Sequence, residues 1–312
     1  MTTRVDATLL RRVARHLPVL LLGRPLHGAE RYAPFFIVGS GRCGTTLLRA
    51  MLEAHPDVHI PPECHAFRMA VRDYRRYARL PWSVVLRVVL SHYEFAGNWY
   101  TFDLPLGPLF RELCGASPRG RNLAAVLDAL YRAHAARLKP GATRWGDKTP
   151  LNTYALRELR AVFPDLRVIH MVRDGRDVVG SYFGLTHYDP TFYAQQWIKA
   201  VRTAQAFGAR YPAHYLEVRY EDLVLRPRLI LEGVTAFLGL TFDERMLRHH
   251  ELDLRLGDVD RIPHFQGARQ AIHNGAVGRW RKDFNASQIA EVERLLGPTL
   301  ATLGYARTAD SV

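Results

Sequence analysis

The segment FFIVGSGRCGTT, residues 35–46, decides the fold class of this chain. Its first four residues form a short apolar run, which is typical of a buried parallel strand. Glycines follow at 39, 41 and 44, and residues 45–55 have the composition of a helix. The segment therefore predicts a strand, a glycine-rich turn and a helix in succession. Such a turn can bind a phosphate group through its backbone N–H donors and the helix N-terminus.

The turn has the glycine spacing of the nucleoside-triphosphate loop G-x-x-x-x-G-K-[ST], but it lacks the lysine of that loop. Thr45 occupies the lysine position, and a basic residue, Arg42, occurs earlier. Because the loop lysine contacts the terminal phosphates of a triphosphate, its absence disfavours a kinase. It favours a ligand with one phosphate at the helix end and a further anionic group nearby. A magnesium-dependent small-molecule kinase and a glycine-rich turn without a ligand stay open as alternatives.

Further strands and helices alternate along the chain. An α/β fold is therefore expected, with a P-loop-type parallel sheet of about five strands and helices on both faces. Beside residues 35–38, the predicted strands are 58–60, 144–147, 166–172 and 215–218. The predicted helices are 65–79, 124–138, 152–163, 192–211, one after Pro227, and 287–303.

Two regions differ in composition. Residues 34–312 are expected to form one α/β domain, and residues 1–33 an amphipathic extension in which Leu9, Leu10, Val13 and Leu17 recur at helical spacing among arginines. The extension could pack on the domain or rest as a basic helix on a membrane surface. No apolar run approaches the roughly 18 residues of a spanning helix.

The chain is strongly basic. Of its 312 residues, 43 are Lys or Arg and 30 are Asp or Glu, which gives a formal net charge of +13. Only four of the 43 are lysines, so 39 are arginines, the side chain that holds phosphate and sulfate in a planar fork. A polyanionic partner is expected, and no recognised nucleic-acid-binding motif occurs.

The three cysteines, Cys43, Cys64 and Cys114, are too few for a disulfide framework and have no C-x-x-C spacing. A reducing compartment fits this usage. We expect a bacterial, cytoplasmic protein, with peripheral membrane contact through residues 1–33 as an open alternative.

A second anion site is predicted after the strand at 166–172. Arg173 stands at the carboxyl end of that strand, where open parallel sheets bind ligands, and Ser181 follows about two helical turns later. A cation and a hydroxyl in these places could hold a second phosphate. On spacing alone, an ordinary turn with Arg173 paired to an aspartate is equally compatible.

Together these motifs resemble those of sulfotransferases that use 3′-phosphoadenylyl sulfate (PAPS), from about Phe35 to the end of the chain. The loop resembles the family's 5′-phosphosulfate loop, Arg173 and Ser181 its 3′-phosphate motif, YEDL at 220–223 its Y-E-D-L, and residues 275–284 its late glycine-tryptophan segment. The resemblance is closer to the protein-tyrosine and glycan branches than to the cytosolic phenol branch. It implies donor binding by Gly39, Gly41, Arg42, Cys43, Gly44, Thr45, Thr46, Arg173, Ser181, Tyr220, Gly278 and Arg279.

The resemblance also implies the chemistry: sulfuryl transfer by in-line displacement to a hydroxyl or amine acceptor, with no metal. Arg42 and Lys148 would stabilise the donor and its bridging oxygen. The cytosolic branch has a histidine base where this chain has Pro150, so the base is expected to be Glu63, with His55 and His65 as rivals. A kinase and a non-catalytic nucleotide- or polyanion-binding module remain the alternatives.

The acceptor is not identified by the sequence. Two groups of side chains could contact it, and each has a structural alternative. The arginines that follow Glu63 could meet an anionic acceptor or form a solvated helix face: Arg68, Arg72, Arg75, Arg76 and Arg79. The aromatic cluster further on could line a pocket or belong to the core: Tyr93, Phe95, Trp99, Tyr100 and Phe102.

Overall fold

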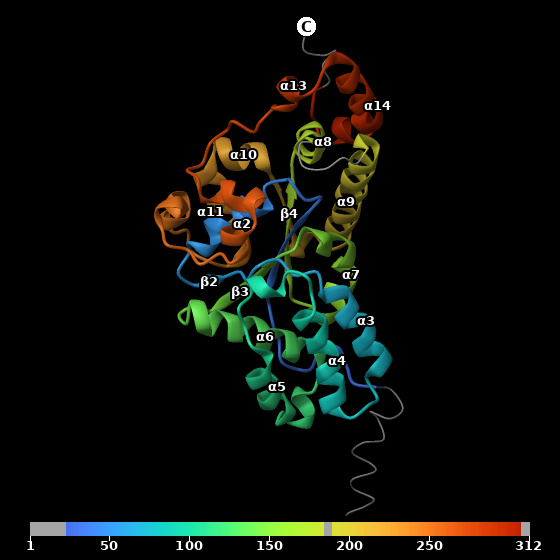
Figure 1. Cartoon of the computed structure of the whole chain (residues 1–312), viewed down its shortest axis with the longest axis vertical. Coiled ribbons are helices and arrows are strands. Elements are labelled where there is room, and N and C mark those ends of the chain that lie inside the picture. The colour runs from blue at the N-terminus through green and yellow to red at the C-terminus, as the bar shows by residue number, and fades with distance from the viewer. Residues whose placement is uncertain (1–22, 184–188, 307–312) are drawn as a thin grey trace, which may run out of the picture.

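A computed structural model describes residues 23–183 and 189–306. Its centre is a parallel sheet of five strands in the order β2-β3-β1-β4-β5 (Figure 1). The strands are β1 (Phe35–Gly39), β2 (Val58–His59), β3 (Arg144–Lys148), β4 (Arg167–Val172) and β5 (Tyr215–Arg219). The predicted fold class and all five predicted strands are confirmed.

The central strand β1 separates two cores. Phe36 and Val38 point into one hydrophobic cluster, and Phe35 and Ile37 point into the other. This alternation follows from the period of two along a strand. Helices must therefore cover both faces of the sheet to keep these side chains from water.

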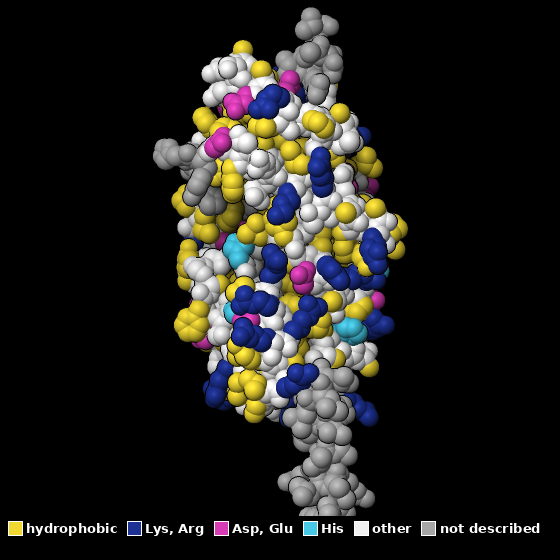
Figure 2. All heavy atoms as spheres, turned by 90° about the vertical axis from the view of Figure 1, so that its right-hand side faces the viewer, with side chains coloured by type: hydrophobic (Ala, Val, Ile, Leu, Met, Phe, Trp, Pro, Cys, Tyr) yellow, Lys and Arg dark blue, Asp and Glu magenta, His cyan; other side chains and the backbone are white. Residues whose placement is uncertain are grey.

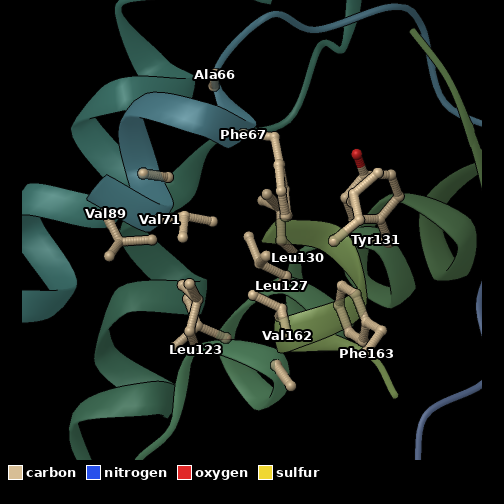
Figure 3. Packing of buried hydrophobic residues seen from close by; sticks show 14 of the residues in the cluster. Ala66, Phe67, Val71, Val89, Leu123, Leu127, Leu130, Tyr131, Val162 and Phe163 are labelled. Carbon is tan, nitrogen blue, oxygen red and sulfur yellow. The ribbon is translucent and has the colours of Figure 1, made fainter. Parts of the chain in front are cut away.

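One face is covered by α3 (Phe67–Tyr77), α4 (Trp82–Glu94), α5 (Leu106–Cys114), α6 (Leu123–Leu138) and α7 (Leu156–Val162). Figure 3 shows side chains of this core converging from α3, α4 and α6 and from the end of α7. The other face is covered by α2 (Thr45–Glu53), α8 (Gly175–Phe183), α10 (Tyr220–Leu225), α11 (Pro227–Leu238) and α14 (Ala286–Thr302). The long α9 (Pro190–Arg210) contributes to both cores, and α12 (Asp258–Arg261) and α13 (Trp280–Asp283) are short.

The sequence prediction differs from this structure in its helices, and α8, α10, α12 and α13 are among those that it did not include. The helix expected at 152–163 begins as a 3₁₀ turn, Pro150–Ala155, before α7. Helices α4 and α5 were not predicted, and the aromatic cluster named between Tyr93 and Phe102 lies mostly in the segment that joins them. The predicted amphipathic helix within residues 1–33 lies mostly outside the described residues. Among the residues described, no helix is long and apolar enough to span a membrane.

The two groups of side chains that could contact the acceptor do not form a binding site in the structure. The arginines lie on the surface, and the aromatic residues are divided between the core and the surface. All five arginines, four on α3 and Arg79 just after it, are exposed, and Figure 2 shows many Lys and Arg side chains on the lower part of this side of the molecule. In the aromatic cluster Tyr93 and Phe102 are buried, whereas Phe95 and Tyr100 are exposed. None of these ten residues lines either of the two cavities described below.

Candidate functional site

A cavity of about 710 Å³ opens at the carboxyl ends of the strands. Its walls come from the turn after β1, from Arg173 after β4, from Tyr220 after β5, and from the chain between Phe265 and Asp283. Ligands of open α/β sheets bind at this edge because successive loops meet there. The cavity therefore collects residues that are far apart in the sequence.

The turn after β1 has the backbone of an anion-binding loop. Gly41, Arg42 and Gly44 all have positive φ, at 77°, 56° and 89°. Gly44 leaves no room for a side chain, because a Cβ there would overlap the ring of Tyr220. Helix α2 begins at Thr45, so its N-terminal N–H groups and dipole face the same space. Gly41, Arg42, Gly44, Thr45 and Thr46 line the cavity, as the sequence predicted.

The second predicted anion site meets the first. The Arg42 side chain donates from Nε to the Ser181 hydroxyl at 2.9 Å. Arg173 donates to the Arg42 carbonyl at 3.1 Å, and its guanidinium lies 4.6 Å from the centre of the Tyr220 ring. The buried Nε of Arg173 has no hydrogen-bond partner among the described residues. An unsatisfied buried donor is costly, so this nitrogen fits a site completed by an anionic ligand.

The cavity also concentrates positive charge. Burial lowers the pKa of Arg42, and the neighbouring guanidinium groups of Arg173 and Arg279 lower it further. A guanidinium remains protonated at neutral pH in spite of such a shift. Asp177 lies 3.7 Å from Arg173, and Asp283 lies 2.7 Å from Arg279. The geometry favours a polyanion.

Three predicted binding residues shape the cavity without lining it. The Gly39 N–H donates to Thr153 Oγ1 at 2.9 Å, and a Cβ at Gly39 would contact Cys43, which is fully buried. The Gly278 N–H donates to Asp177 at 2.8 Å. Asp177 also accepts a bond from the backbone of Trp280, so this carboxylate ties the late glycine-tryptophan segment to α8. It holds Arg279 at the wall of the cavity.

The predicted base, Glu63, belongs to a buried cluster of ionised groups. Lys148, which is fully buried, donates from Nζ to Glu63 Oε2 at 2.7 Å and lies 3.6 Å from Asp258. Asp258 also accepts a bond from the backbone N–H of Glu63 at 3.1 Å and pairs with the buried guanidinium of Arg49. Burial alone would raise the pKa of Asp258, but the charges of Arg49 and Lys148 outweigh that effect and hold it below its ordinary value.

The two rival bases, His55 and His65, differ in their distance from the cavity and in their hydrogen bonds. His55 is buried in the turn after α2, where its Nε2 donates to the Thr241 carbonyl at 2.8 Å and its Nδ1 accepts from the Asp57 backbone at 3.1 Å. Both ring nitrogens are engaged and His55 lines neither cavity, which disfavours it as a base. His65 is half-exposed and lies 3.4 Å from Glu63 Oε1, so it remains close to the cavity. Pro150, which stands where the cytosolic branch has its histidine base, also lines the cavity.

The cysteines near the site are small buried residues. Burial raises the pKa of the Cys64 thiol to about 12 and also raises that of Cys43. A thiol in this state is a poor nucleophile because little thiolate is present. The structure therefore agrees with a packing role for both.

A second cavity, of about 510 Å³, adjoins the first. The two share Glu63, His65 and Phe265, so one carboxylate faces both spaces. Asn98, on the wall of the second cavity, donates to the backbone carbonyl of Glu63. This arrangement can place two reactants on either side of a single base.

Sequence reasoning missed Asp258, Arg49 and Asp177. Asp177 carried a usable signal, because it lies four residues after Arg173, and the sequence analysis had left open a pairing of Arg173 with an aspartate without naming which one. Asp258 carried none. It stands 110 residues from Lys148 and 209 from Arg49 in the chain, and only the folded chain brings these three groups together.

A family model described as the sulfotransferase family matches residues 34–244. The chain belongs to the sulfotransferase family. It is 25% identical to protein-tyrosine sulfotransferase A of Caenorhabditis elegans over 293 residues, which cover 89% of this chain and 69% of that protein. It is 26% identical to protein-tyrosine sulfotransferase 1 of Danio rerio over 280 residues, 86% of this chain and 71% of that protein.

Solved structures agree with this assignment. The sulfotransferase domain of the Synechococcus PCC 7002 olefin synthase superposes with a TM-score of 0.63 at 25% identity, covering 89% of this chain and 97% of that domain. The sulfotransferase domain of the curacin biosynthetic pathway gives a TM-score of 0.59 at 20% identity, covering 89% and 99%. The prediction of a sulfotransferase is confirmed, and family membership favours it over the kinase and the non-catalytic module.

Proposed function

We propose that this sulfotransferase uses PAPS as donor and a hydroxyl group as acceptor, with Glu63 as the general base. The observation that carries the proposal is the position of the Glu63 carboxylate on the walls of both cavities. A base between a donor site and an acceptor site can take the proton of an acceptor hydroxyl as that oxygen attacks.

The larger cavity has separate places for the two anionic ends of the donor. The turn after β1 and the N-terminus of α2 would hold the 5′-phosphosulfate, through backbone N–H groups and the side chains of Arg42, Thr45 and Thr46. Arg173 and Ser181 would hold the 3′-phosphate, with Arg279 beside them. The unsatisfied Nε of Arg173 supports an anionic ligand at this position. A cavity of about 710 Å³ is also in the range that holds ligands of nucleotide size.

Charge moves from the sulfuryl group to the bridging oxygen during an in-line transfer, so fixed positive groups near that oxygen lower the barrier. Arg42 and the N-terminus of α2 are placed for this task. Lys148 is the buried cation next to the base, and we keep it as the proposed partner of the leaving oxygen. In the structure its ammonium donates to Oε2 of Glu63. Oε1, which lies 3.4 Å from His65 Nε2, would accept the proton of the acceptor.

The test is Glu63→Gln, with Glu94→Gln on the exposed end of α4 as the matched control. Glutamine keeps the shape of the side chain but cannot accept a proton at neutral pH. Transfer from radiolabelled PAPS to a panel of hydroxyl acceptors should slow by roughly 10²–10⁴-fold, the usual contribution of a general base. Affinity for adenosine 3′,5′-bisphosphate, measured by calorimetry, should stay close to that of the unaltered protein, and Glu94→Gln should change neither.

Two results would overturn the proposal in different ways. Unchanged turnover in Glu63→Gln, with loss of turnover in His65→Ala, would make the histidine the base. Failure of the unaltered protein to bind adenosine 3′,5′-bisphosphate would remove PAPS as the donor.

A further inference from the structure

The second cavity has predominantly apolar walls. Ala66 and Met69 come from the start of α3, Ala96 and Gly97 from the chain after α4, and Ile262 lies just after α12. Phe265 closes the side that is shared with the larger cavity. Pockets of this kind take up ligands by burying apolar surface, while a few polar groups fix the orientation.

The polar groups on these walls are largely engaged. His92 donates to Asp73 at 2.9 Å, and Asn98 donates to the backbone carbonyl of Glu63. Asp258 is held by Arg49 and Lys148. This leaves Glu63 and the half-exposed His65 beside it as the groups placed to receive a hydroxyl proton.

The second cavity lacks the cluster of positive charges that lines the first. Among the residues that the structure describes, no Lys or Arg lines it, whereas the carboxylates of Glu63 and Asp258 both border it. The α3 arginines face solvent instead. Lys148 and Arg49 are already paired with Glu63 and Asp258. A carboxylate or sulfate on a bound acceptor would therefore lose its water without gaining a cation of its own on the described walls, and a buried charge without a partner is costly.

We infer that the second cavity binds the acceptor and selects an uncharged, largely apolar alcohol or phenol. The inference rests on the proposed function, because Glu63 must act on the hydroxyl held there. In the reaction the acceptor oxygen forms a bond to sulfur, and its proton passes to Glu63. The bond between sulfur and the bridging oxygen breaks, and its electron pair leaves with adenosine 3′,5′-bisphosphate.

The test uses two matched pairs of acceptors that differ by one carboxylate: 2-naphthol against 6-hydroxy-2-naphthoate, and 1-octanol against 8-hydroxyoctanoate. With radiolabelled PAPS, kcat/KM for at least one neutral acceptor should exceed that of its anionic partner by about tenfold or more. Direct binding of 2-naphthol, followed by its fluorescence without donor, should show the same preference over the naphthoate.

Met69→Arg, with Leu229→Arg on the exposed face of α11 as control, adds a test of location. Both add one positive charge at an exposed apolar residue, but only Met69 lines the cavity. Met69→Arg should narrow or reverse the preference for the neutral acceptor, and Leu229→Arg should leave it unchanged.

The outcomes distinguish the two proposals. If the unaltered enzyme prefers the anionic partner in both pairs, or if an acidic peptide or acidic glycan is the faster acceptor, the cavity assignment is wrong while the proposed function stands. If 2-naphthol binds but no acceptor is sulfated and adenosine 3′,5′-bisphosphate does not bind, the proposed function fails and the assignment of the cavity to apolar hydroxyl compounds stands. If Met69→Arg behaves as Leu229→Arg does, the acceptor binds elsewhere.

Discussion

Replacing Asp258 by Asn tests the buried charge cluster behind the proposed base. Arg49 is 1% exposed, and Lys148 and Asp258 are fully buried, so solvent screens these charges little. In Asp258→Asn the two cations keep only Glu63 as a nearby counter-charge. Removing one partner of a buried ion pair typically costs about 3–5 kcal/mol, because the remaining charge stays desolvated.

The same loss can be expressed as a melting temperature. An unfolding entropy of about 2.1 cal/mol/K per residue gives about 0.66 kcal/mol/K for 312 residues, so the variant should melt roughly 5–8 °C lower. Asp260→Asn is the matched control, because Asp260 pairs with Arg269 near the surface, where an ion pair contributes about 0–1 kcal/mol. Calorimetry and urea unfolding at pH 7 measure both variants.

The pH dependence gives a second readout. The pKa of Asp258 is lowered in the folded protein, so its carboxylate stabilises the fold fully above the ordinary value of about 3.9. This contribution is lost as the pH falls through the lowered value. The difference in free energy of unfolding between the unaltered protein and Asp258→Asn should therefore be constant between pH 7 and about 5, and it should shrink below about pH 3.9. If the free energy of unfolding of Asp258→Asn at pH 7 lay within about 1 kcal/mol of that of the unaltered protein, the reasoning would be refuted.

Three further predictions concern the donor site. Arg173→Ala and Ser181→Ala should each weaken the binding of adenosine 3′,5′-bisphosphate by about 1.5–3 kcal/mol, and the binding of adenosine 5′-phosphosulfate much less. Equal losses of affinity for the two ligands in calorimetry would remove both residues from the 3′-phosphate site. Gly44→Ala should lower both donor affinity and melting temperature, because its Cβ would overlap the ring of Tyr220. The control Gly97→Ala has open space around its Cβ and should not lower the melting temperature. Equal melting temperatures of the two variants would show that the turn tolerates a side chain. Transfer should continue at full rate in EDTA, and a strict requirement for added magnesium would contradict the proposed chemistry.

The central strand, the glycine turn and α2 could be predicted because their signals are local. An apolar run must be buried, and glycines at 41 and 44 permit the positive φ that the turn adopts. The position of Arg173 after β4 was equally predictable, since the carboxyl ends of parallel strands share one edge. Helices α4 and α5 were missed because residues 82–92 and 106–114 were not tested for a helical period, and the aromatic cluster between Tyr93 and Phe102 lies mostly outside both helices.

The sequence by itself determined the strands of the sheet, the glycine turn and most of the predicted residues that line the larger cavity, because each depends on neighbours a few positions apart. Only the tertiary structure decided how the base is surrounded. It joined Glu63 and Lys148 to Asp258 and Arg49, engaged both nitrogens of His55 in a turn, and opened an apolar cavity against Glu63. The physical reason is that buried charges must find partners wherever the folded chain supplies them, and a partner more than 100 residues away leaves no periodic pattern in the sequence.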